Sequence, residues 1–494
     1  MTTPERLPPR LSAAAGLVAL LVVSWAFFAV GVRFGVFVSL YWIVGLVFYY
    51  WYARLSSDPL DPLSPGFVLV MVLFLYAAAP GLYVERRGHT YLGDVIPPSV
   101  LNQYYVACLL GLLGLAIGVS GARRHRRAAE APRTIWLLAP SDACVQRVLS
   151  YVAVFLAIVS FPFIVSGFDF FQVPSYSERA MELRLEWRDN VQSGVLAVVS
   201  RDVPTALILA AACLLVIRSR SLWVRGMCLL LFAAYIATNT LAGWRGIVIS
   251  ALLMPVVFYH YRVRPLRLWS VAILALLGYL ITSGLALVRQ TSDARQMMQV
   301  MSDEVRTEGM NFAKLDSSGE LMVGGNLMTL IQGINDGSVE LTYGKSLVTE
   351  FATFIPRSLY PDRPLTLGEQ FAREFSPTTH DAGGGFGFFC VMEGYWAFGY
   401  VGTFVFMLVF GWSVERVYQW FMRNMTRDVT ALWYHGVFVM LVLVSVRNGI
   451  IGTYKLALMN SLPFLVLALA SRIWAGRESV RGPDNRVEGE HRAN

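Results

Sequence analysis

The chain has 494 residues, of which 56% are hydrophobic and only 15% are charged, and its mean hydropathy is +0.53. This composition is too apolar for a soluble chain of this size and predicts a polytopic membrane protein. The net charge of +8 does not indicate nucleic-acid binding, because the basic residues gather in short turns between alternate apolar stretches. The five cysteines show neither a disulfide framework nor a zinc-binding spacing, and we predict no metal and no cofactor.

Twelve apolar stretches are long enough, or nearly so, to cross a bilayer. A hydrocarbon core about 30 Å thick needs roughly 20 residues of helix, so we expect an all-α fold with about 12 transmembrane helices. The first stretch lacks a cleavage site of small residues and is interpreted as a retained signal anchor. The stretches are Leu11–Val30, Val36–Tyr52, Pro65–Val84, Leu101–Val119, Val148–Gly167, Val195–Val216, Leu222–Ala242, Gly246–Tyr261, Leu268–Val288, Tyr400–Phe421, Ala431–Val446 and Tyr454–Ile473.

Clusters of arginine follow alternate spans and predict the orientation of the chain. They follow the fourth, sixth, eighth, tenth and twelfth spans, so all of them lie on one side of the membrane if the spans alternate. Positive charge marks the cytoplasmic side, which places both termini in the cytoplasm. The long polar interruption at 290–394 then faces outward. It carries 7 Lys and Arg against 14 Asp and Glu, a net charge of −7 that leaves +15 for the remainder.

The chain accordingly divides into four parts. Residues 1–289 hold spans one to nine, 290–396 form the extracytoplasmic loop, 397–475 hold spans ten to twelve, and 476–494 form a polar cytoplasmic tail that we expect to be disordered. Three outward segments have recognisable patterns. We expect a turn at Pro97-Pro98, an amphipathic interfacial helix at 177–192, and loop helices at 293–315 and 321–334, with irregular backbone beyond Pro356.

Five basic residues stand at outward ends of helices, where the positive-inside rule disfavours them. They are Arg201, Arg245, Arg289, Arg447 and Lys455. A guanidinium within a span costs about 2 to 3 kcal/mol on insertion scales, so something should stabilise it. Each could pair with a nearby carboxylate or reach the lipid headgroups. Five at one depth favour a shared anion instead, and a pyrophosphate fits the bidentate fork of a guanidinium.

A proline-rich segment of the loop carries two more arginines. Its sequence at 356–364 is PRSLYPDRP, with Arg357 and Arg363 near its ends. Three prolines restrict the backbone, which suits the recognition of a phosphate or a sugar, and Tyr360 could stack on a sugar ring. The alternative is a surface turn with solvated arginines and a packed tyrosine.

Two titratable residues near the end of the loop are candidates for proton transfer. His380 precedes three glycines at 383–385, and Glu393 stands just before the tenth span. Either could accept a proton from a sugar hydroxyl. The alternatives are a surface histidine and a glutamate that pairs with an outward arginine. The glycines lack the Lys-Ser or Lys-Thr of a phosphate loop and are interpreted as a hinge.

The proline-rich segment and the run from Glu393 to Gly402, EGYWAFGYVG, combine with the topology to resemble the bacterial O-antigen or oligosaccharide repeat unit polymerases of the Wzy type. The resemblance implies a GT-C-like fold in the inner membrane. It also implies a polyprenyl-pyrophosphate-linked glycan as substrate, with no metal, and a chain-length regulator as a further candidate partner. The family's outer-loop arginines are thought to hold the pyrophosphate. By resemblance we expect this role for Arg357 and Arg363, and also for Arg245 and Arg447. The family supplies no general base.

The leading hypothesis is therefore a polymerase that joins lipid-linked repeat units into a surface polysaccharide at the outer side of the membrane. Arginines would stabilise the departing pyrophosphate, where charge develops. An O-antigen ligase, which handles the same donor, is the nearest alternative. A transporter of polysaccharide or lipid-linked sugar is the alternative from another class, although transporters bind at the bilayer midplane between repeats, and no repeat is evident here.

Overall fold

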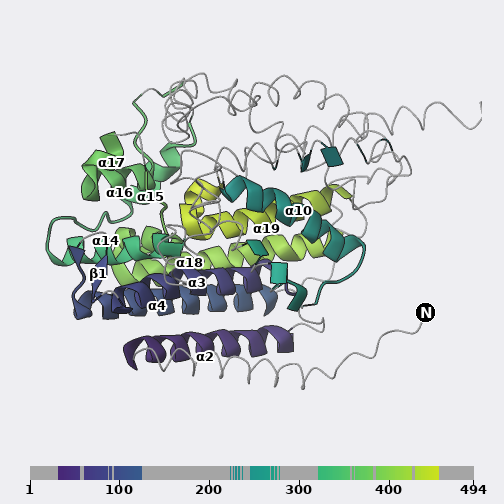
Figure 1. Ribbon diagram of the computed structural model, residues 1–494, viewed down its shortest axis with the longest axis horizontal. Helices are drawn as coiled ribbons and strands as arrows, with labels where there is room; N and C mark the ends of the chain where they lie inside the picture. Colours follow the sequence, from purple (N-terminus) through teal and green to yellow (C-terminus); the bar gives the residue numbers. More distant parts are fainter. Residues whose placement is uncertain are drawn as a thin grey trace, which may run out of the picture. The chain divides into compact units, whose positions relative to one another are not determined.

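The computed structural model describes residues 32–55, 61–86, 88–91, 94–124, 245–267, 321–355, 359–360, 362–381, 385–424 and 429–454, with isolated residues between 223 and 278. Within these ranges the chain is helical apart from loops and one two-stranded hairpin (Figure 1). The chain forms two compact units. The first comprises Met1–Ala131, Ser302–Gln419 and Leu441–Lys455, and the second comprises Pro132–Met301, Trp420–Met440 and Leu456–Asn494.

Several predicted spans coincide with helices. Three of these helices, α3, α4 and α18, are long and apolar enough to cross a membrane. The other predicted spans lie wholly or partly outside the described residues, so the number twelve stays a prediction. The helices that match are α2 (Val32–Leu55), α3 (Pro65–Arg86), α4 (Pro98–Arg124), α10 (Arg245–Arg262), α18 (Cys390–Asn424) and α19 (Val429–Asn448).

Glycines bring α4 and α18 into direct backbone contact. A Cβ on Gly114 or Gly118 would collide with carbonyl oxygens of α18, and a Cβ on Gly411 would collide with the carbonyl of Leu115. Small residues allow membrane helices to approach this closely, because lipid provides little hydrophobic force to press them together. The two helices therefore form one rigid pair, on which the other elements of the first unit are built.

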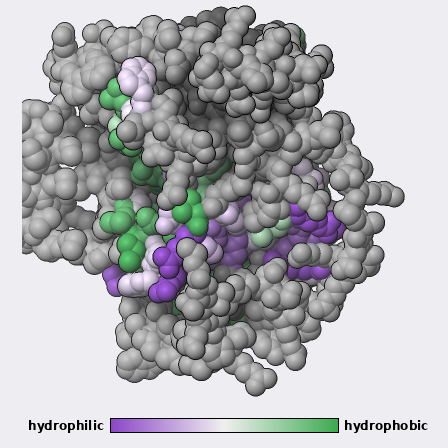
Figure 2. All heavy atoms as spheres, turned by 90° about the vertical axis from the view of Figure 1, so that its right-hand side faces the viewer, coloured by the Kyte–Doolittle hydropathy of each residue, from purple (hydrophilic) through white to green (hydrophobic). Residues whose placement is uncertain are grey.

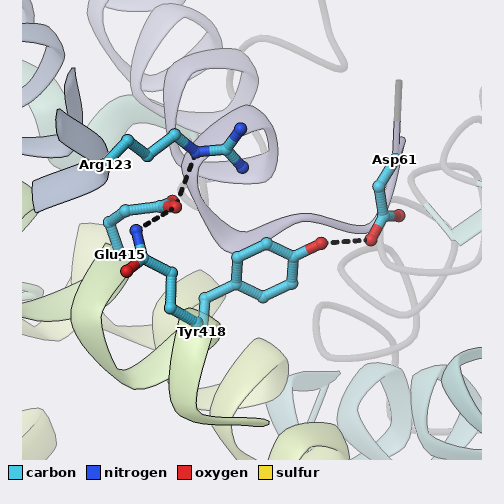
Figure 3. Close-up of polar contacts among 5 residues, drawn as sticks. Asp61, Arg123, Glu415 and Tyr418 are labelled. Atoms are coloured by element: carbon cyan, nitrogen blue, oxygen red, sulfur yellow. Dashed lines mark hydrogen bonds and ion pairs between the residues drawn. The ribbon is translucent and has the colours of Figure 1, made fainter. Parts of the chain in front are cut away.

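A buried ion pair joins the C-terminal end of α4 to α18 (Figure 3). Arg123, in the last turn of α4, places Nε 2.6 Å from Oε1 of Glu415 on α18, and the amide of Gln419 donates to the same oxygen over 3.1 Å. The side chain of Glu415 is fully buried. A charge in this environment is stable only with such partners.

The turn between α2 and α3 is fixed at the same end. The hydroxyl of Tyr418 donates to Oδ2 of Asp61 over 2.6 Å, while Oδ1 of Asp61 accepts from the backbone N–H of Leu63. Pro65 then begins α3, at the helix position where a missing N–H costs least. Figure 2 views this end of the helices, where hydrophilic residues gather beside hydrophobic ones. This end of the first unit is thus held by polar contacts between distant segments.

At the opposite end, part of the large loop packs on α3 and α4 (Figure 1). The hairpin of β1 (Thr90–Tyr91) and β2 (Asp94–Val95) meets the 3-10 helix η5 (Leu321–Gly325) and helix α14 (Asn326–Asn335). The hydroxyl of Tyr91 lies 2.7 Å from the carbonyl oxygen of Met322, and burial raises its pKa, which keeps it protonated as a donor. The amide of Asn326 donates to the carbonyl of Gly387 over 2.9 Å.

The loop is more regular than its sequence suggested. The helix expected at 321–334 is confirmed by η5 and α14, and Gly337 follows in the left-handed region with φ of 73°. The expectation of irregular backbone beyond Pro356 is wrong for α16 (Leu367–Phe375) and α17 (Pro377–Asp381). Thr366 and Glu369 form a capping box that starts α16, a signal that is present in the sequence. Helix α15 (Lys345–Ala352) was not expected either.

The ion pair of Arg123 with Glu415 provides a test of this fold. Replacing Arg123 with Ala should destabilise the protein by about 3 to 5 kcal/mol, because Glu415 stays buried without its cation. The double replacement Arg123→Leu with Glu415→Leu should recover part of the loss. The thermal transition of the purified protein in detergent measures both. Arg416→Ala is the matched control, since Arg416 is exposed over the ring of Trp412. Equal shifts for Arg123→Ala and Arg416→Ala would contradict the assignment.

Candidate active site

The residues proposed from sequence for the site differ in how far the structure describes them. Arg201, Arg289, Arg357 and Lys455 lie outside the described residues. Arg245 begins α10 in the second unit, and the position of its side chain is not described. The remaining candidates are Tyr360, Arg363, His380, Glu393 and Arg447, which all belong to the first unit.

Helix α18 contains a sharp reversal near its N-terminal end. Helical backbone angles are interrupted at Phe398 and Gly399, the latter with φ of 64°. In a straight helix, residues eight positions apart lie about 12 Å apart along the axis. A Cβ on Gly394 would nevertheless lie 2.6 Å from the carbonyl oxygen of Gly402. The segment 390–397 is therefore a short helix that folds back along the beginning of the segment 400–424.

This short helix reaches well down the bundle. A Cβ on Gly111, in the middle of α4, would lie 3.2 Å from Val391 and 3.6 Å from Thr403 and Met407. Val391 therefore lies at the level of the first and second turns after the reversal. The prediction that the membrane-crossing helix starts near Tyr400 agrees with this geometry, while the helix before it was not foreseen. Such re-entrant backbone is tolerated at membrane depth only where protein surrounds it or water fills a cavity.

Glu393 lies on the re-entrant helix and holds a third segment. Its side chain is 1% exposed, and its two carboxylate oxygens accept from the backbone N–H groups of Ile450 over 2.7 Å and Ile451 over 3.2 Å. Gly449, with φ of 83°, ends α19, and a new helical run begins at Ile450. The carboxylate therefore caps the N-terminus of this run, where negative charge is favourable.

A second buried carboxylate approaches the same run from the loop. Glu350 on α15 is 5% exposed, and its Oε2 accepts from the N–H of Leu367 over 2.7 Å at the start of α16. A Cβ on Gly452 would lie 3.3 Å from its Oε1. The sequence reasoning did not single out Glu350. Its signal was the polar spacing of Ser346, Glu350 and Thr353 within an otherwise apolar stretch.

Arg447 lies directly before the segment that these two carboxylates hold. It is in the last turn of α19 and half-buried, and its Nη1 donates to the side-chain oxygen of Asn448 over 3.3 Å. Phe388, just ahead of the re-entrant helix, pairs with Asn448 in an isolated parallel bridge. A Cβ on Gly387 would lie 3.2 Å from the carbonyl oxygen of Arg447. The backbone that carries this guanidinium is thus fixed on several sides.

Arg363 and Tyr360 have different surroundings. The Nη1 of Arg363 donates to the carbonyl oxygens of Thr353 over 3.0 Å and Ile355 over 3.2 Å, so the arginine satisfies the C-terminal end of α15. Tyr360 is 41% exposed. The proline-rich segment is therefore anchored at Arg363, whose guanidinium has a structural role in addition to any role toward a ligand.

His380 lies on the short helix α17 and is half-exposed. Its backbone N–H donates to the carbonyl of Ser376 over 3.1 Å, which fixes the main chain of this helix. Gly383 and Gly384 of the expected hinge lie outside the described residues. Among the described side chains, no group of three or more His, Cys, Asp or Glu is arranged to hold a metal ion.

Comparison with known proteins gives one match. A family model described as O-antigen polysaccharide polymerase Wzy matches residues 17–478. No curated protein and no solved structure matches the chain. The matched region contains all the helices described above, both buried carboxylates and Arg447. It therefore extends far beyond the two motifs that suggested the resemblance.

The cap by Glu393 predicts that Gly449 tolerates no side chain. Gly449→Ala should shorten the O-antigen chains made by cells, because a Cβ would lie 2.5 Å from Oε1 of Glu393 and φ is 83°. The cost of the backbone conformation alone is about 1 to 2 kcal/mol. Gly121→Ala is the control, since nothing lies within 4 Å of a Cβ there. Chain length at matched protein level measures the effect, and identical chains from both variants would refute the cap.

Proposed function

Because the chain belongs to the O-antigen polysaccharide polymerase Wzy family and polymerises lipid-linked repeat units into O-antigen, we propose that it does so at the outer helix ends around Arg447. One observation carries this proposal. The segment that follows Arg447 is capped by the buried carboxylate of Glu393 from the re-entrant helix, and the buried carboxylate of Glu350 approaches it from the loop. A guanidinium on so rigid a support loses little further freedom when it binds an anion.

The anion in this proposal is the pyrophosphate of a polyprenyl-linked glycan. A hydroxyl oxygen of one repeat unit attacks the anomeric carbon of the growing chain with inversion. A new C–O bond forms, the bond from the anomeric carbon to the phosphate oxygen breaks, and the pyrophosphate leaves with the electron pair. Arg447 stabilises the charge that develops on it, with Arg357, Arg363, Arg245, Arg201 and Arg289 as the further proposed ligands. Guanidinium groups can do this without a metal.

The proton of the attacking hydroxyl needs an acceptor. Both oxygens of Glu393 already accept backbone N–H groups and the side chain is buried, which supports a positioning role for this residue. The imidazole of His380 is half-exposed, and histidine is the side chain that most often acts as a general base. We therefore assign the base to His380, and Tyr360 is the proposed stacking surface for a sugar ring.

The protein is a multi-pass membrane protein, and the proposal includes its orientation in the membrane. Both termini are placed in the cytoplasm of a bacterial cell and the loop outside its inner membrane, as the arginine clusters indicate. Polymerisation at the outer face would then leave the acidic loop accessible to a chain-length regulator.

Substitution of the proposed pyrophosphate ligands tests this function. Arg447→Ala should lower the polymerisation rate by about 10²-fold, the loss typical when one donor to a developing oxyanion is removed. Arg447→Lys should retain part of the rate, because a point charge remains without the bidentate fork. The O-antigen ladder of cells that lack the native gene measures this at matched protein level.

Two further variants make the result specific. Arg357→Ala should shorten the ladder as Arg447→Ala does, whereas Arg416→Ala, an exposed arginine on α18, should leave it unchanged. Unchanged long chains in both Arg447→Ala and Arg357→Ala would rule out the pyrophosphate assignment.

A separate pair of variants tests the proton acceptor. His380→Gln should abolish elongation while leaving the thermal transition of the protein intact, because the imidazole is the base. Glu393→Gln should keep measurable elongation, since an amide oxygen can still accept one N–H of the Ile450 run, but should lower the thermal transition. Thr378→Ala, on the same short helix as His380, is the control. Full activity in His380→Gln together with an inactive but equally stable Glu393→Gln would reverse the two roles.

A further inference from the structure

Helix α15 has its polar side inward and its apolar side outward. On α15, Ser346 and Glu350 are buried, whereas Val348 is 71% and Phe351 54% exposed. The turn that follows continues this division, since Thr353 is buried and Ile355 is 44% exposed. A helix on a water-exposed loop has the opposite arrangement, because apolar surface in water raises the free energy. A contiguous apolar surface of this kind marks contact with a partner or with lipid.

The position of α15 beside membrane segments indicates that its apolar side contacts lipid. Glu350, on its buried side, reaches Gly452 in the helical run that Glu393 caps. Glu393 itself lies on the re-entrant helix, which folds back along the outer turns of a membrane-crossing helix. α15 therefore lies beside segments at membrane depth, and does not stand above them in solvent.

The exposed side of α15 also continues a surface that faces lipid. Val401, Val405 and Val409 of α18 are exposed at helical spacing along a candidate membrane span. Phe398, at the reversal that begins this stripe, is exposed as well, and its ring would lie 3.0 Å from a Cβ on Gly344, which precedes α15. The backbone N–H of Thr342 donates to the carbonyl of Trp396 over 2.9 Å, which fixes the two segments side by side.

We propose that α15 and the turn that follows it form an interfacial segment whose Val348, Phe351 and Ile355 side chains lie among the acyl chains of the outer leaflet. Lys345, exposed in its first turn, would reach the headgroups, as lysine does at the edge of a bilayer. Part of the segment that composition and charge assign to an extracytoplasmic loop is then embedded in the membrane. This inference does not depend on the pyrophosphate assignment or on the identity of the base.

Fluorescent labels at single introduced cysteines test the placement. Val348→Cys, Phe351→Cys and Ile355→Cys are labelled with NBD in the full-length protein and reconstituted into vesicles of phosphatidylethanolamine and phosphatidylglycerol. Val401→Cys is the lipid-facing control, and Asp336→Cys, in an exposed turn, is the water-facing control. The unmutated protein gives the background from its native cysteines.

Labels on α15 should be quenched severalfold more than the label at 336 by lipids with a nitroxide below the headgroup, and to an extent similar to the label at 401. Aqueous iodide should give the reverse order. Iodide quenching equal to that at 336 would overturn the proposal by showing a surface in water. Protection from both quenchers would also overturn it, because protein or a second copy would then cover the helix. If one of these cysteine variants no longer shows a thermal transition, the label is placed at Tyr343→Cys instead, because Tyr343 is also exposed.

Discussion

The hydrogen bonds from the N–H groups of Ile450 and Ile451 to the buried carboxylate of Glu393 are the contact on which the part of the first unit around Arg447 depends. A carboxylate at this depth is stable only when its oxygens are satisfied, and a helix N-terminus presents free N–H groups. The carboxylate therefore satisfies the free N–H groups, and these N–H groups satisfy the carboxylate oxygens. The re-entrant helix, the turn at Gly449 and the end of α19 are held together by this one interaction, and Arg447 takes its position from it.

The loop is joined to the same centre by polar contacts of similar kind. Glu350 accepts from the N–H at the start of α16 and approaches Gly452, Arg363 satisfies carbonyls at the end of α15, and Asn326 donates to Gly387. In each case a side chain satisfies a backbone group that has no partner within its own helix or strand. The loop is consequently an integral part of the membrane-bound bundle, which explains how residues far from the membrane spans in sequence can contribute to a site at the helix ends.

The opposite end of the first unit is fixed by direct contact between helices. Glycine contacts and the pair of Arg123 with Glu415 make α4 and α18 a rigid frame. The end around Arg447 is built from short elements with reversals at Gly399 and Gly449, which side chains hold in place. A polymerase must admit a lipid-linked donor and a second glycan and then release a longer product. Short elements held on a rigid frame suit that task, because the backbone that carries Arg447 keeps its position throughout. The family match favours this activity over the ligase and transporter that the sequence left open.

Hydropathy and charge by themselves determined that this is a polytopic membrane protein, placed α3, α4 and the start of the tenth span near Tyr400, and suggested the family through two short motifs. These are local properties, because transfer into lipid depends on the composition of each segment alone. Tertiary structure decided that Glu393 is a cap, that Glu350 approaches the helical run capped by Glu393, that Arg363 closes α15 and that a re-entrant helix precedes Tyr400. Each of these depends on a polar group finding a partner in a distant segment, 57 positions away for Glu393 and Ile450, and no local pattern specifies that pairing.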